Sequence, residues 1–145
     1  MFVTTHALTG GLLASKVANP LFSYPLILIS HFLMDRIPHW DFGTAFKRTQ
    51  KARIAIFGFV DLTTALVLAW LVFQKNASFN PLLWGGVILS FLPDLIELPA
   101  LLFEFRPFPL NKFEQFHSRC FHRKNKFLPG LIPQIIILAL ILLFR

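Results

Sequence analysis

Three long apolar runs decide what this chain can fold into: residues 52–73, 81–103 and 128–144. Each comes close to or exceeds the roughly 20 residues that an α-helix needs to cross the hydrocarbon core of a bilayer. Two shorter apolar runs, 2–18 and 20–35, precede them, and the second spans only about 22 Å as a helix. The pattern predicts an all-α polytopic integral membrane protein with four to five transmembrane helices, whose 145 residues form one membrane domain.

The composition agrees with this interpretation. The chain is 55% hydrophobic, contains 18 Phe and has a mean hydropathy of +0.63, which is too apolar for a soluble domain of this length. No Lys or Arg precedes the first apolar run, so we expect a retained helix rather than a signal peptide. Helices of these lengths leave no room for a soluble catalytic module. Any active site must therefore be built from the membrane helices and their connections.

The basic residues gather in two connections, 36–53 and 104–127, which hold eleven of the fourteen Lys and Arg residues. Two predicted spans separate these connections, so both lie on one side of the membrane, and the positive-inside rule makes that side cytoplasmic. Within the second connection, residues 111–126 place aromatic and basic side chains on opposite sides of a helix. This predicts an interfacial amphipathic helix on anionic lipid. The net charge of +7 therefore indicates a membrane surface and no nucleic-acid partner.

Residues 30–41 carry the pattern most typical of a chemical site. In a helix, His31 and Asp35 lie one turn apart on the same face, and the turn after them can return His39 and Asp41 toward that face. Imidazole nitrogens and carboxylate oxygens together suit zinc, with manganese or iron as other candidates. The alternative is a helix end whose polar side chains only anchor it at the membrane interface.

Further polar groups are expected at the same depth. His6 lies level with residues 30–41 if the first two segments form a hairpin, and Asp61 and Asp94 lie in the cytoplasmic halves of their helices. An ionised carboxylate in hydrocarbon costs at least a few kcal/mol, so these groups need a shared partner such as a divalent cation. The expected metal ligands are His6, His31, Asp35, His39, Asp41 and His117. Asp94 and Asp61 are the expected catalytic carboxylates; in the alternative, the carboxylates only form ion pairs with Arg residues.

The same residues resemble a known family, the small bacterial and archaeal inner-membrane proteins described as membrane-bound metal-dependent hydrolases. The resemblance rests on Thr5-His6-Ala7 before a glycine-rich helix, on residues 30–41, and on Leu92-Pro93-Asp94. The segment from His31 to His39 is also similar to the HxxxD motif, with its following Pro and His, of zinc-dependent phospholipases C. These resemblances imply location in the inner membrane and phosphodiester hydrolysis by zinc ions bound to His and Asp.

We therefore expect a metal-dependent hydrolase that acts on a lipid or lipid-linked phosphoester at the cytoplasmic leaflet. Arginine guanidinium groups bind phosphate well, and the expected contacts of the substrate phosphate are Arg36, Arg119 and Arg123. The main alternative is a non-enzymatic protein that binds or transports a cation, and a third is a scaffold whose charges merely pair. The sequence leaves the oligomeric state open.

Overall fold

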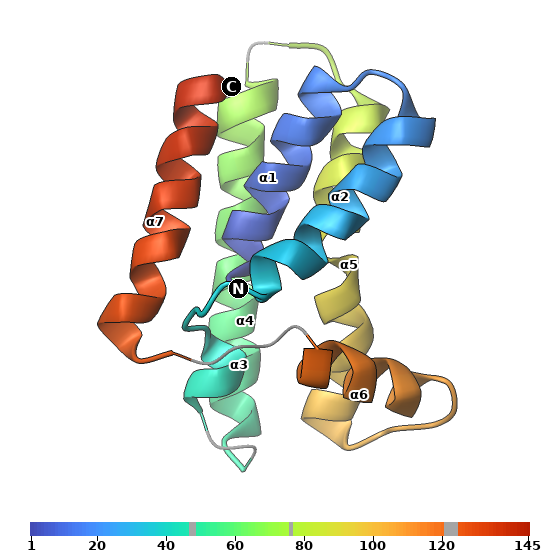
Figure 1. The fold of residues 1–145 in the computed structure, drawn as a ribbon, viewed down its shortest axis with the longest axis vertical. Helices are drawn as coiled ribbons and strands as arrows, with labels where there is room; N and C mark the ends of the chain where they lie inside the picture. Colours follow the sequence, from blue (N-terminus) through green and yellow to red (C-terminus); the bar gives the residue numbers. More distant parts are fainter. Residues whose placement is uncertain (47–48, 76, 121–124) are drawn as a thin grey trace.

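The computed structural model describes residues 1–145 except 47–48, 76 and 121–124, and its regular elements are helices (Figure 1). In chain order they are α1 (Val3–Lys16), α2 (Pro20–Asp35), α3 (Phe42–Ala45), α4 (Lys51–Ala69) with its π-helical extension η1 (Trp70–Gln74), α5 (Pro81–Phe103), α6 (Leu110–Cys120) and α7 (Phe127–Phe144). The described part of the chain contains no strand. The prediction of an all-α chain is therefore confirmed.

Three helices are long and apolar enough to cross a membrane. They are Lys51–Gln74, which joins α4 and η1 in 24 residues, α5 with 23 residues and α7 with 18 residues. Helices α1 and α2 have only 14 and 16 residues, fewer than the roughly 20 that a span requires. The described residues thus provide three candidate spans, not the four to five expected from the sequence. These three are consistent with an integral membrane protein.

Local sequence sets both ends of α2. At its start, the side chain of Asn19 accepts a hydrogen bond from the Leu21 amide at 2.9 Å, and Pro20 occupies the first helical position. At its end, Pro38 disfavours helical backbone in the preceding residue and has no N–H to donate. The helix therefore stops directly after Asp35 and leaves the next residues free to turn back toward it.

Helix α1 lies at the centre of the bundle and packs against α2, α4, α5 and α7 (Figure 1). The contact with α5 is close: a Cβ atom added at Gly10 would lie 2.5 Å from the carbonyl oxygen of Gly86. Only glycine fits at such a distance. The absence of a side chain at Gly10 thus brings α1 directly against α5. The apolar core around this contact includes Ala7, Leu8, Ala65, Val87 and Phe91.

Helix α1 begins inside the bundle, where its free amide groups meet a carboxylate of α4. The backbone amides of Val3 and Thr4 donate to Asp61 at 2.8 and 3.2 Å, and the Thr4 hydroxyl donates to it at 2.7 Å. A carboxylate at a helix N-terminus satisfies unpaired N–H groups and complements the helix dipole. The intramembrane carboxylate of Asp61 therefore has a structural partner.

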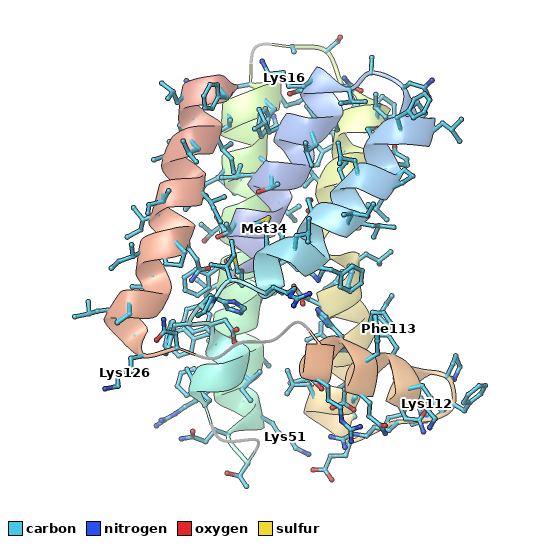
Figure 2. All side chains as sticks on the ribbon, in the orientation of Figure 1. Lys16, Met34, Lys51, Lys112, Phe113 and Lys126 are labelled. Atoms are coloured by element: carbon cyan, nitrogen blue, oxygen red, sulfur yellow. The ribbon has the colours of Figure 1, made fainter. Side chains whose placement is uncertain are left out.

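The basic residues mark one end of the bundle. Figure 2 shows Lys51, Lys112 and Lys126 at the lower end and Lys16 at the opposite end. Helix α6 lies at the lower end and packs against α5. It ends at Cys120, earlier than the expected boundary at residue 126; residues 121–124 lie outside the described part of the chain.

Candidate metal centre

The carboxylate of Asp35 is the centre of a buried polar cluster. Both Asp35 and His31 have 0% exposure, and they occupy one face of α2, with 3.3 Å between His31 Nε2 and Asp35 Oδ2. The HxxxD spacing thus places its two side chains together inside the bundle. Ionised carboxylates are rarely buried without a partner, so the surroundings of Asp35 decide what the cluster can do.

Three side chains, those of His31, His117 and Asp94, converge on the Oδ2 side of Asp35 and form a group of four with it. His117 of α6 brings its Nε2 atom within 3.2 Å of Asp35 Oδ2 and within 3.4 Å of His31 Nε2. Asp94 of α5 brings Oδ1 within 3.8 Å of His31 Nε2. Each of the four offers one ligand atom, and these atoms all lie within 4.8 Å of one another. Two imidazoles and two carboxylates form a donor set that suits zinc.

The outer nitrogens of these imidazoles are held by acceptors. His31 Nδ1 donates to the backbone carbonyl of Ser90 at 2.7 Å, and His117 Nδ1 donates to Glu97 Oε1 at 2.8 Å. A neutral imidazole that donates through Nδ1 carries its lone pair on Nε2. Both lone pairs then point at each other and at a carboxylate, so a proton or a cation must lie between them. Metal-binding histidines commonly have this arrangement.

A second group of ligand atoms faces the other oxygen of Asp35. His6 Nε2 lies 3.2 Å from Asp35 Oδ1, and His39 Nε2 lies 3.9 Å from that oxygen and 3.0 Å from Asp41 Oδ2. His39 also donates through Nδ1, to the carbonyl of Ile37 at 2.8 Å. The amino group of Met1 contacts Asp35 Oδ1 as well. Asp35 therefore presents one oxygen to each of two groups of ligands.

The charge state of His117 follows from its two carboxylate neighbours. Burial alone would lower its pKa, but the hydrogen bonds to Asp35 and Glu97 outweigh this effect and raise the pKa of His117 to about 9. Without a metal, His117 therefore carries a proton on both nitrogens at neutral pH and donates through Nδ1 to Glu97 and through Nε2 to Asp35. Metal binding would have to displace the Nε2 proton.

Gln134 fixes the loop that carries His39 and Asp41. It is 1% exposed, and its Nε2 donates to the carbonyl of Trp40 at 2.8 Å while its Oε1 accepts from the Phe2 amide at 2.9 Å. One side chain thus ties this loop to the start of α1 and hence to His6. The sequence analysis named no site residue in the last helix and missed Gln134. The available signal was a lone amide in an otherwise apolar span.

Most of the predicted site residues belong to this cluster, and the others that the structure describes lie away from it. The structure brings together all six expected metal ligands and Asp94, whereas the hydrogen bonds of Asp61 go to the first turn of α1. Arg36, next to Asp35 in sequence, and Arg119, on α6, are exposed. Arg123 lies outside the described residues.

Asp94 is the most exposed member of the group of four. Its side chain is 23% exposed, whereas those of His31, Asp35 and His117 are 0% exposed. No family model, curated protein or solved structure was found to match this chain.

Proposed function

We propose that this chain is a metal-dependent hydrolase that acts on a lipid or lipid-linked phosphoester at the cytoplasmic leaflet. The observation that carries the proposal is the convergence of two Nε2 atoms and a carboxylate oxygen within 3.4 Å of one another, with both Nδ1 atoms already bonded. Once the His117 proton is displaced, a divalent cation can bind all three atoms at once. Zinc suits this mixture of nitrogen and oxygen ligands, and manganese or iron are alternatives.

The two oxygens of Asp35 support two cation positions. The first position would be held by His31, Asp35, Asp94 and His117, and the second by His6, His39, Asp41 and the other oxygen of Asp35. Bound metal would supply a water of lowered pKa near neutral pH. The buried histidines and Asp35 exclude bulk water from this chemistry, and the resemblance to zinc-dependent phospholipases C points to the same ligand types.

The partly exposed carboxylate of Asp94 is the residue we assign to the reaction. It is the most accessible member of the first ligand group, so it can contact both a cation and an incoming water or phosphate. Asp61 was an equal candidate from the sequence. Its oxygens are engaged by α1, so the proposal assigns Asp61 to structure and Asp94 to catalysis, as a ligand or as general base.

We propose that the end of the bundle with the basic residues faces the cytoplasm. The lysines at the lower end of Figure 2 favour a cytoplasmic location for that end, and α6 would lie there at the interface. Helices α1 and α2 would enter the bilayer as a hairpin that does not cross it. The cluster then lies just inside the cytoplasmic leaflet, where the exposed Arg36 and Arg119 can attract an anionic head group. Arg123, at the end of the same connection, is proposed for the same role from its sequence position.

The test is hydrolysis with controlled metal content. Protein purified in detergent would be stripped with a chelator, returned to vesicles of phosphatidylethanolamine and phosphatidylglycerol, and assayed for release of water-soluble phosphate after zinc, manganese or iron is restored. We expect metal-dependent release that His31→Ala abolishes and Glu104→Gln preserves, because Glu104 pairs with Lys51 away from the cluster. Stoichiometric metal binding without hydrolysis would instead support the non-enzymatic cation-binding alternative.

A further inference from the structure

An apolar groove lies between α2 and α7, with α1 as its floor. Its volume is about 390 Å³. The walls include Leu33 from α2, Ile37 from the turn after it and Leu140 from α7, and Thr9 and Leu13 of α1 lie between them. Figure 1 shows α1 between these two helices in the same arrangement. The groove is thus formed by the two helices too short to span a bilayer and by the last candidate span.

The lining of the groove offers almost nothing to a polar ligand. Its two hydroxyl groups donate to backbone carbonyls of their own helices: Thr9 Oγ1 to Thr5 at 2.8 Å, and Ser30 Oγ to Ile27 at 2.7 Å. The walls are also accessible from outside, because Leu33 and Leu140 are 59% and 48% exposed. In a membrane these surfaces meet hydrocarbon. A ligand seated here must therefore be an alkyl chain.

One end of the groove adjoins the candidate metal centre. Met34 and Ile37 line it and flank Asp35 in the sequence, and Thr9 lies one turn beyond His6 on α1. From Leu26 to Met34 the groove follows α2 for eight residues, or about 12 Å, and Ile37, in the turn after α2, extends it further toward the cluster. One leaflet of a bilayer contributes about 15 Å of hydrocarbon. The groove therefore comes close to the length of one lipid tail and begins beside the ligand cluster.

We propose that this groove binds one alkyl chain of the phosphoester lipid substrate and so holds the head group at the cluster. The proposal rests on the proposed function for the identity of the substrate. In this proposal, α2 and α7 select the substrate by the shape and length of its alkyl chain, in addition to any selection by the head group. Hydrogen-bonding partners are unnecessary, because an alkyl chain in the bilayer is held by van der Waals contacts with the groove walls.

Photo-crosslinking tests the groove without requiring metal or hydrolysis. The full chain would be placed in nanodiscs of phosphatidylethanolamine and phosphatidylglycerol that contain a trace of phosphatidylglycerol with a diazirine at the end of one acyl chain. After irradiation, mass spectrometry locates the labelled residues. We expect label to concentrate at the end of the groove away from the cluster, on Leu12, Leu26 and Phe144.

A matched pair of variants on α7 controls the experiment. Leu140 lines the groove and Leu142 does not, yet their exposures are similar at 48% and 51%. Leu140→Trp should reduce labelling of the groove several-fold, and Leu142→Trp should leave it unchanged. Ser30→Leu fills the groove from the opposite wall and should repeat the effect of Leu140→Trp. Circular dichroism in the same nanodiscs establishes that each variant is folded.

Three results would overturn the proposal: label spread over the outer faces of α4 and α7 in proportion to exposure, groove labelling unchanged in both filling variants, or cross-links showing a second copy of the chain in the groove. The outcome is separable from the hydrolase proposal. Groove labelling in a protein that hydrolyses no lipid would support lipid binding alone, and hydrolysis with dispersed label would reject only the groove.

Discussion

His31 and His117 lie 86 residues apart in the chain, yet their Nε2 atoms face each other at 3.4 Å across the carboxylate of Asp35. Each ring is fixed from behind by an acceptor, so neither nitrogen can turn to find another partner. This relationship makes the cluster a candidate metal centre.

Glu97 is expected to position His117 without contacting a metal. Its Oε1 accepts from His117 Nδ1 at 2.8 Å. Removing such a partner typically weakens metal affinity by about 10- to 100-fold. We expect Glu97→Ala to show this loss in a zinc competition assay with a chelator, and Glu97→Gln to recover part of it because the amide oxygen still accepts. Unchanged zinc affinity in Glu97→Ala would show that Glu97 does not position the ligand.

Zinc affinity should rise with pH. The pKa of His117 is raised to about 9, so below that pH a proton must leave before Nε2 can bind a metal. This proton alone contributes up to a tenfold loss in affinity for each unit by which the pH falls below about 9, and no further gain above it. Zinc titrations between about pH 6 and pH 8 measure the slope. The slope should be shallower in His117→Asn; an equal slope in this variant would exclude His117 as the source.

Asp61 should matter for stability and not for metal binding. Loss of a cap at a helix N-terminus costs about 0.5–2 kcal/mol, so Asp61→Ala should lower the unfolding temperature in detergent. Its zinc content should equal that of the unmodified chain. Thr64→Ala is the matched control on α4, because the Thr64 hydroxyl bonds only its own helix, at the carbonyl of Val60. Loss of zinc in folded Asp61→Ala would show that Asp61 contributes to metal binding.

Gln134 is expected to hold the loop of His39 in place. Gln134→Leu leaves the Trp40 carbonyl and the Phe2 amide without their partner, at a cost of about 1–3 kcal/mol for an unsatisfied buried group. Amide exchange in residues 39–41 should become faster, whereas Ile135→Leu on the exposed face of α7 should change nothing. Exchange in this loop that stays unchanged in Gln134→Leu would contradict the assignment.

Hydropathy and short-range spacing predicted much of this molecule. The three long runs became the three candidate spans, and the spacing of His31 and Asp35 placed both on one helix face. The common depth of the polar groups also anticipated that His6 and Asp94 would lie close to Asp35. These features depend on helical periodicity and on membrane thickness, which can be read along a single chain.

Features that depend on contacts between helices were not predictable in this way. An aspartate in a membrane span indicates a functional site when only the sequence is known. The position of α1 shows that Asp61 caps a helix. Likewise, Gln134 acquires its role through Trp40, 94 residues away. The two short helices were counted as possible spans because apolar runs alone do not distinguish a hairpin inside a bundle from a crossing.

Metal content of the purified protein tests the central claim most directly. We would measure zinc, manganese and iron per chain by elemental analysis in the unmodified protein, in Asp35→Ala and in Asp61→Ala, each purified in detergent without chelator. The account predicts bound metal in the unmodified protein, retention in Asp61→Ala and loss in Asp35→Ala, because Asp35 is shared by both ligand groups. Full metal occupancy in folded Asp35→Ala, or none in the unmodified protein after metal is supplied, would contradict it.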